Sequence, residues 1–189
     1  MKRSKQETAE TRERIVEAAA AEFRKNGIDR TGLNDLMAAA GLTHGGFYRH
    51  FHTKNDLVAE ASALAFHTLA THLAELVTLK SRQDGAEVVT AEYLSAKHRD
   101  HPETGCFLAA NASELARADV SIRDVATEGF LRLVDLVAAQ YDGRKDAAKR
   151  RAIVAVSTMI GALALSRIVT DPDLSDEILA QAEKELTAG

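Results

Sequence analysis

Apolar residues recur at intervals of three and four positions along most of this chain, which is the spacing of one face of an α-helix. Between residues 11 and 26, Ile15, Ala18, Ala19 and Phe23 follow this spacing. No segment alternates apolar and polar residues as a half-buried strand does, and no repeat of fixed period is visible. The sequence therefore predicts an all-α fold.

Turn and capping signals divide this pattern into separate helices. Gly27 ends the first helix, and Thr53 and Asp56 have the spacing of a capping box at the start of a long one. We expect this long helix to begin beside the residues that precede Thr53 and to end in the C-terminal part of the chain. A rotation at its far end would then move the segment at its start. After a polar break at residues 80–85, the further helices are expected at about 85–100, 103–117, 121–141, 144–170 and 173–187.

Residues 33–57 predict two short helices joined by a tight turn. Gly41 can adopt the positive φ that ends the first helix, and Thr43 can accept a hydrogen bond from the N–H groups that open the second. Two helices joined in this way form a helix-turn-helix. Gly45 and Gly46 each cost about 1 kcal/mol of helix stability relative to Ala, so their presence favours a surface that a phosphate or a base edge approaches closely.

The second of these helices is a cationic region of an acidic chain. The whole chain has a net charge of −4, yet no Asp or Glu lies between residues 36 and 55. Residues 1–60 hold 10 Lys and Arg against 9 Asp and Glu, a net charge of +1, and the remainder holds 14 against 19, a net charge of −5. This asymmetry favours one DNA-facing end with an acidic body turned away.

A helix that reads the major groove needs small or polar residues at its start, an apolar anchor and cations for the flanking phosphates. Phe47 and Phe51 supply the expected anchor. Two residues outside this helix extend the predicted DNA-contacting surface: Arg12, near the start of the first helix, and Thr31, the expected cap of the helix at Leu33. The predicted DNA-contacting residues are Arg12, Thr31, Thr43, His44, Gly45, Tyr48, Arg49, His50 and Lys54.

Residues 11–61 resemble the N-terminal DNA-binding domain of the TetR/AcrR family of bacterial transcriptional repressors. Gly32 departs from the family pattern, which usually has Thr or Ser there, and the resemblance covers about the first third of the chain. It implies a three-helix DNA-binding domain over residues 1–58 and a helical ligand-binding and dimerisation domain over residues 59–189. The matching residues are Thr11, Arg12, Ile15, Ala18, Ala19, Phe23, Gly27, Thr31, Leu36, Ala40, Gly41, Gly46, Tyr48, Phe51, Lys54 and Leu57.

Residues 152–169 are apolar nearly all round, so a helix there has to be covered on more than one side. Neighbouring helices can cover one side and a second copy of the chain the other. Leu174, Ile178, Ala182 and Leu186 give the last helix a matching stripe. We therefore predict a homodimer through helices 144–170 and 173–187, as the resemblance also implies, with two reading helices on a palindromic operator in double-stranded DNA.

Polar residues interrupt the apolar stripes of the second domain. Asn111 shares a face with Leu108 and Leu115, His67 follows Phe66, and Thr158 lies in the most apolar segment. If buried, these side chains bond either to neighbouring helices or to a ligand in a mainly apolar cavity. The resemblance implies an unidentified small-molecule inducer that binds such a cavity and releases the DNA.

Cys106 is the most specific single candidate for a residue that senses a chemical signal. It lies near an expected helix start, where the helix dipole would lower the pKa of its thiol, and His98 and His101 lie shortly before it. The Gly-Cys sequence resembles a branch of the family that responds to electrophiles and oxidants. The alternative is a small residue in a crowded buried site. A metal site of His98, His101 and Glu103 or Cys106 is less favoured, and we predict no metal and no cofactor.

Two other function classes are alternatives to a regulator. A cysteine- or metal-dependent enzyme in the second domain would need a base on Cys106 or further metal ligands, which the spacing does not supply. An architectural DNA-binding protein would be strongly basic. With one cysteine, no signal peptide and no apolar stretch of membrane-spanning length, the sequence predicts a cytoplasmic regulator without enzymatic activity.

Overall fold

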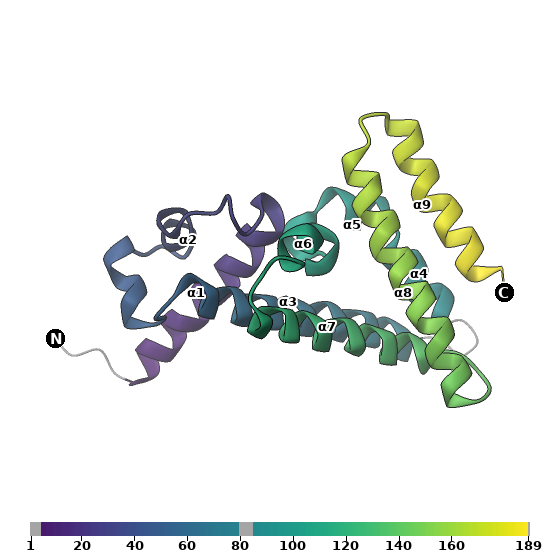
Figure 1. Ribbon diagram of the computed structural model, residues 1–189, viewed down its shortest axis with the longest axis horizontal. Helices are drawn as coiled ribbons and strands as arrows, with labels where there is room; N and C mark the ends of the chain where they lie inside the picture. The colour runs from purple at the N-terminus through teal and green to yellow at the C-terminus, as the bar shows by residue number, and fades with distance from the viewer. Residues whose placement is uncertain (1–4, 80–84, 189) are drawn as a thin grey trace.

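The computed structural model describes residues 5–79 and 85–188, and all regular structure in these ranges is helical (Figure 1). The predicted all-α fold is confirmed. The polar break expected at residues 80–85 lies almost wholly outside the described residues. The elements are α1 (Lys5–Asn26), α2 (Leu33–Ala39), the 3₁₀ helix η1 (His44–Arg49), α3 (Lys54–Thr78), α4 (Gly85–Tyr93), α5 (Ala96–Asp100), the 3₁₀ helix η2 (Pro102–Thr104), α6 (Phe107–Leu115), α7 (Val120–Ala138), α8 (Lys145–Ile168) and α9 (Pro172–Thr187).

The first helices pack around one apolar core. Phe23 of α1, Leu36 of α2, Phe47 of η1 and Leu57 of α3 are fully buried in it. The turn between α2 and η1 contains Gly41 with a φ of +69°, as the sequence predicts. The second helix of the pair is a 3₁₀ helix rather than an α-helix, in keeping with its six residues and two glycines.

The caps of these helices follow the predictions in part. Thr53 accepts from the Asp56 N–H at 3.1 Å while the Asp56 carboxylate accepts from the Thr53 N–H at 2.9 Å, so the predicted capping box is confirmed. Thr43 is the N-cap of η1, but its side chain makes no capping hydrogen bond. The cap predicted at Thr31 is wrong: Gly32 is the N-cap of α2, and the buried Thr31 hydroxyl donates instead to Gly27 O at 2.5 Å.

The second half of the molecule is a helical bundle in which α3 and α7 lie side by side and α8 and α9 stand across their far ends (Figure 1). Two predicted helices are interrupted. The segment at 85–100 divides at Ser95, whose hydroxyl caps α5 by accepting from the His98 N–H at 3.1 Å. The helix expected from residue 103 starts later, because η2 follows Pro102 and Cys106 is the N-cap of α6.

Helix α6 joins the two halves. The core around α1 and α2 extends to Phe107 and Leu115 of α6, so the packing is continuous across the domain boundary expected at residue 58. The Glu114 carboxylate accepts from the backbone N–H groups of Ile28 and Asp29 at 3.0 and 2.8 Å. Each of these residues lies in the turn between α1 and α2. A displacement of α6 would therefore be transmitted directly to the helix-turn-helix.

Helix α8 presents an apolar surface to solvent. Val154, Leu165 and Ile168 are 64%, 53% and 70% exposed, although the opposite side of the helix is buried. By length and composition alone, this helix is also long and apolar enough to cross a membrane, in contrast to the expectation from the sequence. The core helix of a soluble protein meets the same criterion, so this property is weak support for a membrane span.

Candidate nucleic-acid interface and ligand cavity

Helix η1 exposes one contiguous set of the predicted DNA-contacting residues. Thr43, His44, Gly45 and Arg49 are exposed, and Tyr48 is 65% exposed. The exposed Tyr48 side chain can offer its ring to a thymine methyl group or a sugar and its hydroxyl to a phosphate. These five residues project into solvent from one short segment, as a segment that enters a DNA groove requires.

Buried aromatic rings hold η1 in place. Phe47 and Phe51 stack with their centroids 5.7 Å apart, and Tyr48 meets Phe47 edge to face at 5.2 Å. Phe47 and Phe51 are 0% and 2% exposed, which confirms them as the predicted anchor. A Cβ atom added at Gly46 would lie 3.4 Å from the end of the Met37 side chain, so η1 packs closely against α2 at this position.

The four other predicted DNA-contacting residues bind within the protein. The Arg12 guanidinium forms a bidentate ion pair with Glu60 and lies over the Phe51 ring, 4.4 Å from its centroid. The Lys54 ammonium donates to Ile28 O at 2.5 Å. Thr31 is buried, as described above, and His50 is partly buried with contacts of its own. In this conformation these four residues contribute contacts within the protein, and the Arg12 side chain, which is 40% exposed, also reaches the surface.

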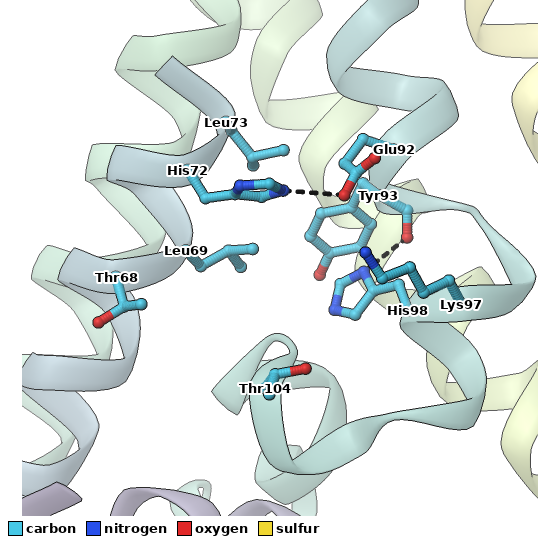
Figure 2. A pocket seen from close by; sticks show the side chains of 9 residues that line it. All are labelled: Thr68, Leu69, His72, Leu73, Glu92, Tyr93, Lys97, His98 and Thr104. Atoms are coloured by element: carbon cyan, nitrogen blue, oxygen red, sulfur yellow. Dashed lines mark hydrogen bonds and ion pairs between the residues drawn. The ribbon is translucent and has the colours of Figure 1, made fainter. Parts of the chain in front are cut away.

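A cavity of about 410 Å³ lies between α3 and the α4–α5–η2 segment (Figure 2). This volume falls within the range of small-molecule sites. The apolar side chains of Leu69 and Leu73 form one wall, and polar groups from both sides surround them. The lining residues are Thr68, Leu69, His72, Leu73, Glu92, Tyr93, Lys97, His98 and Thr104.

His98 is the one predicted ligand candidate that lines this cavity, and its two ring nitrogens are both engaged. Nε2 accepts from the Cys106 N–H at 2.8 Å, so Nδ1 carries the proton and donates to Tyr93 O at 2.7 Å. Burial is the main cause that lowers the pKa of His98 to about 4, and the ring is neutral at pH 7. His98 therefore fixes the loop that leads into α6.

The loop at Gly105 is closely packed. A Cβ atom there would lie 2.6 Å from the His98 ring and 3.3 Å from the Arg167 guanidinium. Arg24 of α1 donates to Gly105 O at 3.0 Å, and Arg167 of α8 donates to His98 O at 2.6 Å and to Arg99 O at 3.0 Å. One short segment thus touches the cavity, the first helix and α8.

The lowered thiol pKa expected for Cys106 is wrong in this conformation. Cys106 is the N-cap of α6, but its side chain is completely buried. Burial raises the pKa of the thiol, and the nearby Tyr93 hydroxyl and backbone N–H groups offset this only in part. Desolvation of the thiolate outweighs the helix dipole because no solvent reaches the sulfur.

The remaining ligand candidates lie apart from the cavity lining. Asn111 is buried at a kink in α6, and its amide donates to Phe107 O at 3.3 Å. His67 is exposed and contacts Arg132 at 3.2 Å. Thr158 is half-buried on α8. The sequence contains a better indication of the cavity than these three residues. Thr68 and His72 are polar, lie one helical turn apart on α3, and flank the apolar Leu69 and Leu73 that form the cavity wall.

No group of three potential metal ligands occurs among the residues that the structure describes. His101 pairs with Glu103 at 3.1 Å, and both nitrogens of His98 are occupied as described. The local geometry thus gives the metal alternative no support.

The sequence model named "Bacterial regulatory proteins, tetR family" matches residues 15–61. The chain is 43% identical over 74 residues to the HTH-type transcriptional regulator TtgR of Pseudomonas putida, which covers 39% of this chain and 35% of TtgR. The match thus spans about a third of that relative. The uncharacterized HTH-type transcriptional regulator MT0206 of Mycobacterium tuberculosis is 30% identical over 193 residues, covering 94% of each chain.

Two solved structures share the whole fold. Reduced NemR of E. coli superposes with a TM-score of 0.79 at 18% identity, covering 94% of this chain and 95% of NemR. A TetR family transcriptional regulator from Cytophaga hutchinsonii gives a TM-score of 0.81 at 23% identity, covering 100% of this chain and 98% of the other. At these identities the similarity concerns the fold alone.

The buried neutral His98 predicts a loss of stability in acid. Between pH 6.5 and pH 4 the unfolded chain binds a proton at this position and the folded chain does not, so the free energy of unfolding falls as the pH falls through this window. The expected loss is about 3 kcal/mol. Urea denaturation at stepwise pH measures it. The His98→Gln variant should be less stable at pH 7 and depend less on pH.

The exposed His67 supplies the matched control for this experiment. His67→Gln should leave the pH dependence of the wild-type chain in place, because the His67 side chain is exposed in the folded protein, whereas the His98 ring is packed against the segment that leads into α6. Equal slopes for His98→Gln and the wild type would contradict the assignment of His98 as a buried neutral group.

Proposed function

Because the chain belongs to the TetR family of bacterial regulatory proteins, we propose that it is a dimeric, DNA-binding transcriptional repressor that a small molecule releases from its operator. The observation that carries the proposal is the exposed face of η1, where Tyr48 and Arg49 stand on an anchored helix-turn-helix. We place the protein in the bacterial cytoplasm, where the chromosome lies. Residues 1–58 are the proposed DNA-binding domain and residues 59–189 the regulatory domain.

Dimerisation is proposed through the exposed side of α8 together with α9. Ser157 and Gly161 lie between the exposed Val154, Leu165 and Ile168, and a side chain added at Gly161 would meet no atom within 4 Å. Small residues flanked by large apolar ones let a second helix approach closely. A two-fold axis there would supply two η1 helices for half-sites about one helical turn of DNA apart, and hence a palindromic operator.

The proposed signal is a ligand in the cavity between α3 and α5. A reactive-thiol signal at Cys106 is less well supported, because the thiol is buried and its pKa is raised. The same geometry gives no support to a cysteine-dependent enzyme: the His98 nitrogen nearest Cys106 accepts from its backbone N–H, so it is not placed as a base on the sulfur.

The proposed route of release runs from the cavity through α6. His98 and Thr104 border the cavity, and the segment that follows leads into α6, whose Glu114 binds the turn between α1 and α2. A ligand that moves the α5–η2 segment would displace α6 and change the tilt of the helix-turn-helix. In this way the spacing of the two η1 helices would no longer fit the operator.

Operator binding tests the DNA-contacting residues. Fluorescence anisotropy with DNA from the gene's own promoter region should detect selective binding at controlled salt. Tyr48→Ala and Arg49→Met should each weaken it by about tenfold or more, and Arg49→Met should reduce the slope of log affinity against log salt by about one. Arg132→Met, the same change on α7, should do neither. Variants that also lose the dimer would show that these residues support the fold.

Sedimentation velocity tests the dimer interface. Leu165→Glu on the exposed side of α8 should give monomers, because burying two carboxylates at a two-fold interface costs several kcal/mol per charge. Leu131→Glu, at a leucine on α7 that is 39% exposed, should stay dimeric. If Leu165→Glu remains a dimer at micromolar concentration, the partner contacts another face.

The Glu114→Gln variant tests the route of release. It keeps the size of the side chain but removes the carboxylate that binds two backbone N–H groups, so operator affinity should be retained while the ligand releases DNA several-fold less effectively. Glu128→Gln on the outer face of α7 is the control. Unchanged release in a folded Glu114→Gln dimer would place the route elsewhere.

A further inference from the structure

Resting on the proposed ligand-binding role of the cavity, the geometry points to a ligand class: a mainly apolar organic acid, such as an aryl carboxylate, bound through the Lys97 ammonium and the Tyr93 hydroxyl. Leu69 and Leu73 form the wall against which the apolar body would lie. A cavity of about 410 Å³ has room for a molecule of one or two rings.

The Tyr93 hydroxyl is a buried donor without a partner. The residue is 1% exposed, and its oxygen makes no hydrogen bond of normal geometry; it interacts only with the nearby Cys106 thiol, which is a weak hydrogen-bonding group. Figure 2 shows the hydroxyl pointing toward the space between Leu69 and His98. Buried hydroxyl groups in folded proteins are nearly always hydrogen-bonded, so a ligand oxygen at the base of the cavity would satisfy this one.

The other polar groups of the lining offer few donors. His98 has both nitrogens engaged, and the Glu92 carboxylate is paired with His72 at 2.8 Å. The Thr68 and Thr104 hydroxyls donate to backbone carbonyls of their own turns. Lys97 is exposed at the cavity and extends toward Tyr93 (Figure 2), and it has no ion pair among the described residues. The unused donors thus call for a ligand that brings acceptors.

The charges behind the cavity favour an anion over a cation. Arg24 and Arg167, both partly buried, converge on the segment that contains His98 and Gly105. Their hydrogen bonds go to backbone carbonyl oxygens, and neither guanidinium forms a salt bridge among the described residues, although the Glu103 carboxylate acts on both through space and the Asp100 carboxylate acts on Arg167. Partly buried charges act through a low dielectric and are weakly screened, so they attract a carboxylate and repel an ammonium group.

Calorimetric titration of the full-length protein without DNA tests this ligand class. The probes are 2-naphthoate, neutral 2-naphthamide and cationic 2-naphthylmethylammonium, which share one apolar body and differ in charge. We expect 2-naphthoate to bind about tenfold more tightly than the amide, as a charge-assisted hydrogen bond would provide, and the cation to bind most weakly.

Two variants assign the contacts. Lys97→Met should remove the preference for naphthoate over naphthamide, and Tyr93→Phe should weaken naphthoate binding several-fold while preserving the fold, since it removes only an unpartnered hydroxyl. Lys149→Met, at an exposed lysine of α8, should bind as the wild type does.

Equal binding of the three probes, tighter binding of the cation, or no binding of any probe at millimolar concentration would overturn the assignment. So would an unchanged preference in Lys97→Met. Operator binding, measured separately, distinguishes the two proposals: naphthoate binding by a protein that binds no operator would contradict the repressor and leave the ligand class standing.

Discussion

The continuity of α3 is the constraint on which the rest of the structure depends. Its capping box at Thr53 and Asp56 fixes where the helix begins, directly after the ring anchor of η1. The same helix then supplies Leu69 and Leu73 to the cavity wall, roughly 20–30 Å further along its axis. Because α3 is one unbroken helix, it fixes the orientation of η1 relative to the bundle that surrounds the cavity.

A second connection limits how that orientation can change. Helix α6 packs against the first core through Phe107 and Leu115, and Glu114 holds the turn between α1 and α2. The helix-turn-helix is therefore held from two directions, by the start of α3 and by the end of α6. Packed elements of this kind move as bodies between discrete arrangements, which is the behaviour that a ligand-controlled regulator needs.

Local signals in the sequence predicted much of the fold. The turn at Gly41, the capping box at Thr53 and the anchor at Phe47 each depend on neighbours within a few residues, and each is found in the structure. The candidate site was predicted less well, because its members meet across the bundle. Neither the pairing of Arg12 with Glu60 nor the position of His72 opposite Glu92 can be read from spacing. For Cys106, the decisive quantity was burial, which spacing along one helix does not determine.

The close packing at Gly105 has a consequence for how this protein can change over generations. A Cβ atom there would lie 2.6 Å from the His98 ring, so this position is closed to every other amino acid unless that ring moves. The helix-borne residues Thr68 and Lys97 have no such restriction. If the cavity binds a ligand as proposed, substitutions at those helix positions would change the ligand preference, while the loop at Gly105 would tolerate few substitutions.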